Sequence, residues 1–201
     1  MRHGVRPSST RRPLALLSAS SALFVSSVLF GCGSNVGASK TRKSCDTKCQ
    51  AEVAARGLRE TLKLAYNLTL NGKPVGAQDE SHACLSGDVR VTGEAHSNAA
   101  QGSTEVDLVY TFDSCAYRQV DATQAENYDL SFRGDVSQSG VLTVQPTAPT
   151  ALIITSDALD IEGSVFDPPV EYSETACEVR LQQSGNKLSG TMCGEPVGVS
   201  L

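Results

Sequence analysis

The stretch that decides the fold is Val106-Asp107-Leu108-Val109-Tyr110-Thr111-Phe112. Its bulky apolar residues recur at every second position, which places them on one side of an extended chain. The same alternation returns in residues 128–136, 159–165 and 179–182. An apolar face opposite a polar face is typical of antiparallel strands that cover a core on one side. The sequence therefore predicts an antiparallel sheet.

Turn-forming residues separate these stretches. The breaks contain Gly102, Ser139-Gly140, the segment 146–149, Pro168-Pro169 and Ser184-Gly185-Asn186. Glycine, proline, serine and asparagine favour turns because of their backbone preferences and short polar side chains. Short connections favour neighbouring strands, so we expect a β-meander of about six or seven strands that begins near Asp88.

A helix precedes the sheet. Residues from Asp46 to about Tyr66 are mostly good helix formers. Ala54, Leu58, Leu62 and Tyr66 follow one another at four-residue spacing and would form an apolar face. The fold class is therefore α+β, with this helix packed on the apolar face of the sheet. We expect residues 45–201 to form a single β-rich domain.

Four glycines fall on the apolar side of the predicted strands, namely Gly93, Gly134, Gly163 and Gly190. Glycine inside a strand marks a bend, a bulge or a close approach. The favoured interpretation is that the sheet curls around the helix and that the glycines leave room for helix side chains. The alternative is that they line a groove for an apolar ligand in the curled sheet.

The N-terminus is typical of a secretory signal peptide. Arg2, Arg6, Arg11 and Arg12 precede an apolar stretch from Leu14 to Phe30. A membrane-spanning helix would need about 20 mostly apolar residues. Five serines interrupt this stretch, which favours a cleaved signal over residues 1–31.

The stretch ends in Leu29-Phe30-Gly31-Cys32, followed by Gly33. This ending resembles the lipobox of bacterial lipoproteins, in which the cysteine receives a diacylglycerol and cleavage occurs just before it. The resemblance implies lipid on Cys32 and attachment to a membrane. Because Gly33 is not aspartate, it also implies the outer membrane, on its periplasmic or surface side, if the cell has one. The resemblance covers the first 32 residues and implies no activity.

Residues 32–44 contain Gly, Ser and Lys without apolar periodicity, which predicts a flexible tether. Loss of residues 1–31 removes four of the 17 basic residues, so that 13 face 22 acidic residues and the net charge is −9. An acidic domain repels phosphate backbones, and no basic stripe is present. We therefore exclude nucleic acid as a partner.

Six cysteines remain besides Cys32, and an even number in an exported chain predicts three disulfides. If Val89 lies opposite Tyr110 in the first hairpin, the residue numbers of every directly opposed pair add up to 199, because the two strands are antiparallel. The numbers of Cys84 and Cys115 also add up to 199, which places these two cysteines opposite each other. Cys177 and Cys193 flank the hairpin whose tip is Ser184-Gly185-Asn186. The predicted pairs are therefore Cys84–Cys115 and Cys177–Cys193. Cys45 and Cys49 remain, one helical turn apart, in a position where a bridge would require distortion of the helix end.

Catalytic and metal motifs are not evident, and we expect neither an enzyme nor a cofactor. His82 and His96 occur in polar segments that read as loops, and no nucleophile elbow or phosphate-binding loop is present. Asp160 and Glu162 share one strand face, without the loop that a calcium site needs. The Cys45–Cys49 spacing plus a histidine lacks a fourth zinc ligand.

Three classes of function remain. The first is a lipid-anchored structural or interaction module that contacts another envelope protein. The second is a carrier of an apolar small molecule or lipid, and the third is an unrecognised hydrolase. An apolar cavity would favour the second class, convergent polar groups would favour the third, and a filled core would favour the first.

Overall fold

The computed structural model describes residues 44–201, apart from 71, 74, 99, 101, 122–125 and 144–148. These described residues form one compact unit. The predicted signal peptide, Cys32 and the predicted tether lie outside the described residues, except for Ser44.

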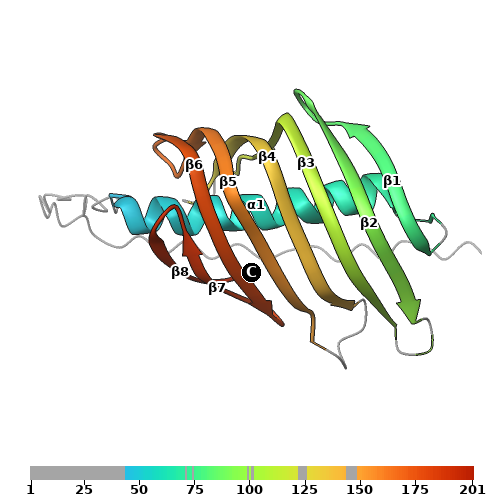
Figure 1. Cartoon of the computed structure of the whole chain (residues 1–201). Helices are drawn as coiled ribbons and strands as arrows, with labels where there is room; N and C mark the ends of the chain where they lie inside the picture. Colours follow the sequence, from blue (N-terminus) through green and yellow to red (C-terminus); the bar gives the residue numbers. More distant parts are fainter. Residues whose placement is uncertain are drawn as a thin grey trace, which may run out of the picture. The chain divides into compact units, whose positions relative to one another are not determined.

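In the described part of the chain, one helix is followed by eight strands (Figure 1). The elements are α1 (Thr47–Thr69), β1 (Gly76–Ala83), β2 (Asp88–Asn98), β3 (Ser103–Gln119), β4 (Tyr128–Thr143), β5 (Ala151–Val165), β6 (Val170–Ser184), β7 (Lys187–Met192) and β8 (Glu195–Ser200). Each strand pairs with the next in antiparallel fashion, in the order β1-β2-β3-β4-β5-β6-β7-β8. The predicted helix and antiparallel meander are confirmed. The predicted number of strands, six or seven, is wrong, and the structure is mostly β.

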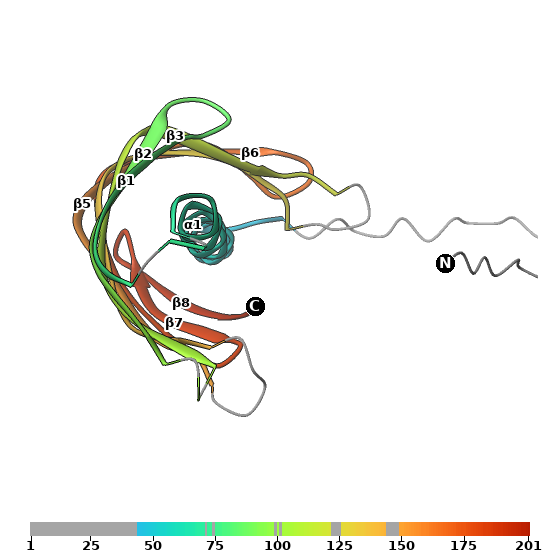
Figure 2. The ribbon, with the colours of Figure 1, turned by 90° about the vertical axis from the view of Figure 1, so that its right-hand side faces the viewer.

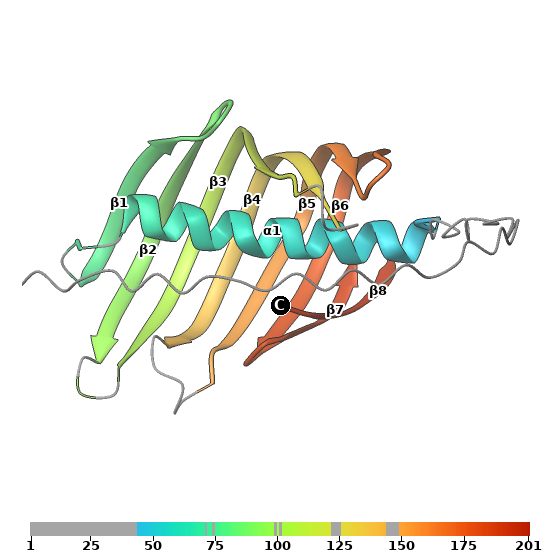
Figure 3. The same ribbon diagram turned by 180° about the vertical axis from the view of Figure 1, so that it is seen from behind.

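The sheet curls around the helix. In a view along α1, the strands curve around it and leave one side open (Figure 2). From the other side, α1 lies across the strands on their concave face (Figure 3). The sheet and helix thus form two layers around one core.

The missed strand is β1, which carries no apolar alternation. Glu80 lies opposite Val91, and His82 lies opposite Val89. Val89 and Val91 are buried in the core. Directly paired residues share a face, so β1 turns charged and polar side chains toward the concave side. Inward-pointing polar residues are a recognised feature of edge strands, where they discourage pairing with other chains.

The predicted register of the first hairpin is wrong by two residues. Val89 lies opposite Phe112, and Val91 lies opposite Tyr110. A shift of two residues keeps every side chain on the same face, so alternation alone does not reveal it.

All three pairs of cysteines form disulfides, including the two predicted pairs Cys84–Cys115 and Cys177–Cys193. Cys84 reaches Cys115 from the end of β1 rather than along β2. The tip of the β1–β2 hairpin bends back onto β3, where the Ala116 N–H donates to the Ser86 carbonyl at 3.0 Å. The predicted pair Cys84–Cys115 is therefore correct, although the strand register from which it was predicted is wrong.

Helix α1 begins where the sequence predicts and extends three residues beyond Tyr66. The Asp46 carboxylate caps it, accepting a hydrogen bond of 2.9 Å from the Cys49 N–H. Cys45 precedes this cap, so its bridge to Cys49, with a Cα–Cα distance of 5.1 Å, lies half outside the helix. The expected distortion of the helix end is therefore unnecessary.

The strand glycines have a different role from the one expected. Gly163 has φ +142°, and a Cβ atom there would lie 2.0 Å from the Asp129 carbonyl oxygen on β4. At Gly190, with φ +139°, the Cβ would lie 2.0 Å from the Arg180 carbonyl oxygen on β6. The obstacle is the neighbouring strand, not the helix, so the predicted clearance for helix side chains is wrong. Glycine kinks of this kind introduce curvature into a sheet, in agreement with the predicted curl.

The close approach between helix and sheet occurs at Gly57 instead. A Cβ atom on Gly57 would lie 3.1 Å from Cδ1 of Leu130 and 3.3 Å from Cδ2 of Tyr128, both on β4. The absence of a side chain at this helix position lets α1 sit deep in the curved sheet.

Candidate functional site

The concave face of the sheet is occupied by α1. Ala54, Leu58 and Leu62 of the predicted apolar face are completely buried, and Tyr66 packs partly against the core. They join one continuous apolar cluster with side chains of β2 to β8. A large apolar cavity of the kind that encloses a lipid would need this space, which the helix fills.

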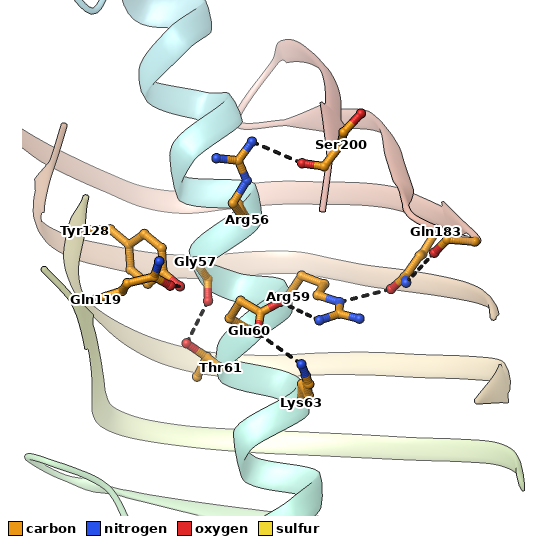
Figure 4. A network of polar contacts seen from close by, with 11 residues as sticks. Arg56, Gly57, Arg59, Glu60, Thr61, Lys63, Gln119, Tyr128, Gln183 and Ser200 are labelled. Carbon is orange, nitrogen blue, oxygen red and sulfur yellow. Dashed lines mark hydrogen bonds and ion pairs between the residues drawn. The ribbon is translucent and has the colours of Figure 1, made fainter. Parts of the chain in front are cut away.

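Polar contacts fasten α1 to the sheet (Figure 4). Arg56 donates to the Ser200 carbonyl of β8 at 3.2 Å and forms an ion pair with Glu126. Arg59 donates from Nε to Oε1 of Gln183 on β6 at 3.1 Å. Gln183 is buried, and its Nε2 donates to the Gly185 carbonyl at 2.8 Å. These side chains are engaged in holding the helix, which explains why cations lie beside the core.

A smaller apolar pocket remains beneath the C-terminal end of α1. Its volume is about 180 Å³, below the range of roughly 300–1,000 Å³ typical of small-molecule sites. The lining residues come from α1, the tip of the β1–β2 hairpin and β3, and they are Thr61, Leu64, Ala65, Leu68, His82, Ala83, Cys84, Leu85, Val89, Cys115, Ala116 and Tyr117. Sequence reasoning missed this pocket. One available signal was Leu85, a large apolar residue in an otherwise polar turn.

Three tyrosines are buried, one each on β3, β4 and β6. Burial raises the pKa of Tyr110, Tyr128 and Tyr172 well above the ordinary value. Tyr110 donates to Oε1 of Gln138 at 2.8 Å, and Tyr128 donates to Oε1 of Gln119 at 2.9 Å. These phenols are therefore neutral at physiological pH and act as hydrogen-bond donors within the core.

The two histidines considered at the sequence level lie in strands, not in loops. His82 is on β1 opposite Val89, whereas His96 is near the far end of β2, with Nε2 3.1 Å from Oε2 of Glu94. The register of β1 and β2 separates them by most of the strand length. The structure therefore does not bring the histidines together.

The acidic candidates lie on the convex face. Asp160 and Glu162 line a polar hollow of about 120 Å³ with Ser114, Ser131 and Arg133. Asp160 accepts a hydrogen bond of 2.9 Å from the Ala176 N–H, and Arg133 donates to Oγ of Ser114 at 2.9 Å. None of these lining residues is a histidine that could act as a general base. Across the described residues, no group of three His, Cys, Asp or Glu side chains is arranged to hold a metal ion.

Comparison with known proteins returned no matching family model, no matching curated protein and no matching solved structure. Within the described part of the chain, no helix is both long and apolar enough to cross a membrane. The three disulfides are consistent with an exported protein.

Proposed function

We propose that this protein is a non-catalytic structural or interaction module of the bacterial cell envelope, anchored by lipid on Cys32. The basic and apolar N-terminus and the lipobox-like ending support export and lipidation. The disulfides suit an oxidising compartment outside the cytoplasm. The −9 charge of the processed chain favours protein or lipid partners over nucleic acid.

The observation that carries the non-catalytic role is the occupied concave face. Leu58 and Leu62 are completely buried, and Arg56 and Arg59 bond the helix to the sheet. The concave surface of the sheet is therefore covered by α1, and this contact stabilises the fold. Function at an outer surface follows from this arrangement.

The two alternative functions have weaker support. A lipid carrier would need the concave space that α1 occupies, and the apolar pocket beneath the C-terminal end of α1 measures about 180 Å³. A hydrolase would need convergent catalytic groups, and His82 and His96 lie far apart along β1 and β2. In the polar hollow on the convex face, Asp160 and Arg133 are already hydrogen-bonded to the Ala176 N–H and to Oγ of Ser114.

The anchor is tested by Cys32→Ala, with Ser34→Ala as a control in the same segment. In cells fed labelled palmitate, we expect label on the wild-type and Ser34→Ala proteins but not on Cys32→Ala. The Cys32→Ala protein should also leave the membrane fraction or remain uncleaved. Normal cleavage and membrane fractionation of Cys32→Ala would refute the anchor.

The choice between an interaction module and a lipid carrier is tested by native mass spectrometry of the protein purified from its own envelope. A co-purifying protein, or a second copy, supports the interaction role. A stoichiometric bound lipid in the purified domain would instead favour the carrier.

A further inference from the structure

Another pocket lies between the side of α1 and the ends of β4 and β5. Its volume is about 180 Å³, and its described lining shares no residue with the apolar pocket near the β1–β2 hairpin. The lining residues that matter for its chemistry are Arg59, Lys63 and Tyr66 of α1, Gln138 and Leu142 of β4, and Leu152 of β5. We call the space between these six side chains the Gln138 pocket.

Gln138 is a polar residue at a core position. It lies opposite Leu108 on β3 and opposite Ile154 on β5, and both of these side chains are completely buried. Directly paired residues share a face of the sheet, so the Gln138 amide points to the concave side, where the residue is 4% exposed. An amide in such a place costs free energy unless its hydrogen bonds are made.

Only one end of this amide has a partner within the domain. Oε1 of Gln138 accepts a hydrogen bond of 2.8 Å from the Tyr110 hydroxyl. Its Nε2, which carries two N–H donors, forms no hydrogen bond with any described residue. Because Gln138 lines the pocket, a partner for Nε2 can lie there. A buried amide with unused donors beside a cavity indicates a ligand that accepts hydrogen bonds.

The charge of the lining selects an anion. Arg59 and Lys63 share one carboxylate, since Glu60 pairs with Arg59 and its Oε2 lies 3.6 Å from Nζ of Lys63 (Figure 4). Two cations and one carboxylate leave one net positive charge, although the processed chain as a whole carries −9. None of the described lining residues is acidic. A ligand with a single negative charge is therefore complementary to this site.

The other groups of the pocket narrow the class of anion. The hydroxyl oxygens of Thr143 and Thr150 lie 3.1 Å apart and are hydrogen-bonded to each other. Lys63 and Tyr66 form no side-chain hydrogen bond with any described residue, so their donors remain available. Leu142 and Leu152 add an apolar wall. Donors on one part and an apolar wall on another suit a carboxylate that bears a hydrocarbon chain, since its two oxygens accept hydrogen bonds and its chain does not.

The size of the pocket limits the chain. At roughly 30 Å³ for a water-sized group, 180 Å³ holds about six non-hydrogen atoms, which is the size of butanoate. We propose that the Gln138 pocket binds a small monocarboxylate, with its carboxylate on Nε2 of Gln138 and Nζ of Lys63 and its chain against Leu142 and Leu152. The described lining contains no Asp, Glu, His or Cys, so the site binds this ligand without cleaving it. The inference goes beyond the proposed envelope role and does not depend on the lipid anchor.

The experiment is a titration of the ¹⁵N-labelled processed chain, with Cys32→Ser and intact disulfides, with sodium butanoate up to about 50 mM. The side-chain amide signal of Gln138 is assigned by its loss in Gln138→Met. We expect this signal to shift and saturate with a Kd of about 1–10 mM, as suits a ligand of so few atoms. In Lys63→Met the Kd should rise at least fivefold. Butanamide, which has the same shape without the charge, should bind at least fivefold more weakly than butanoate.

The matched control is Lys48→Met, which removes the same charge from the same helix. Lys48 is 59% exposed and pairs with Glu52, much as Lys63 is 58% exposed and pairs with Glu60. Lys48→Met should change the Kd by at most twofold, and thermal melting verifies that each variant is folded. The proposal is overturned if the Gln138 amide shows no saturable shift, if butanamide binds as well as butanoate, or if Lys63→Met and Lys48→Met behave alike. Tighter binding of inorganic phosphate than of butanoate, seen at the same amide, would overturn it in favour of a phosphate site.

Discussion

The centre of the sheet and its β1 edge differ in how they are built. Strands β3 to β6 carry 15 to 17 residues each and turn large apolar side chains onto α1. Edge strand β1 has eight residues and places Gln78, Glu80 and His82 on the side that faces the core at the centre. Stability is therefore concentrated at the centre, whereas the β1 margin contains the open pocket and exposed leucines. The difference teaches that the apolar core ends before β1, where polar inward side chains and exposed leucines take its place.

The sharpest test compares a helix leucine over the centre with one near the margin. Leu62→Ala should lower the free energy of unfolding by about 2–5 kcal/mol, because Leu62 is completely buried. Leu68→Ala should change it by less than about 0.5 kcal/mol, because Leu68 is half exposed. Urea unfolding of the two variants measures both values. Equal losses would show that the helix is fastened evenly along its length.

The disulfides provide the next test, since two of them join a margin to the centre. Cys84–Cys115 closes a separation of 31 residues, and its loss by double serine substitution should cost about 3–4 kcal/mol. Cys45–Cys49 closes a separation of four residues, and its loss should cost about 2 kcal/mol or less. Thermal melting of the two double variants ranks them. The reverse ranking would mean that the β1 margin is held mainly by its strand hydrogen bonds.

The same difference explains what the sequence could predict. Residues 106–112 and 128–136 alternate between apolar and polar because one side faces the helix, so pattern alone identifies β3 and β4. Strand β1 could not be predicted from the pattern because both of its faces are polar. Its pairing with β2 depends on backbone hydrogen bonds, which do not show in the sequence composition. The apolar pocket could not be predicted from the sequence for a related reason. It is formed by residues 61–68, 82–89 and 115–117, which are distant in sequence and come together only in the folded domain. The glycines were detected, but their φ angles and the nearby carbonyls were needed to assign their role.

Glycine substitutions test whether curvature is generated at the centre. Gly163→Ala on β5 should destabilise the domain by about 3 kcal/mol, because it combines a positive φ with a Cβ 2.0 Å from a carbonyl oxygen. Gly198→Ala on edge strand β8 is the matched control, since no atom lies within 4 Å of its added Cβ. Its effect should stay within about 0.5 kcal/mol. If chemical denaturation finds both variants alike, the kinks do not determine the curl.

The effect of pH separates the two regions by the sign of the response. At the β1 margin, the hydrogen bond from Arg90 lowers the pKa of Asp79. The Asp79–Arg90 pair therefore stabilises the folded domain at pH values above the ordinary carboxyl pKa, and this stabilisation is lost as the pH falls. Both side chains are exposed, so we expect only a slight decrease in melting temperature at acid pH.

At the centre the response has the opposite direction, because burial raises the pKa of Tyr110 above its ordinary value of 10.0. The unfolded chain releases that phenolic proton near pH 10, while the folded domain retains it. The stability due to the neutral phenol is therefore complete below pH 10 and is lost as the pH rises toward the folded pKa. Each such tyrosine should remove up to about 1.4 kcal/mol per pH unit above 10. Urea unfolding at pH 8, 10 and 11 measures this slope, and Tyr110→Phe should make it shallower even though the variant is less stable at pH 8. A wild-type stability that stays constant from pH 8 to 11 would show that water reaches these phenols in the folded domain.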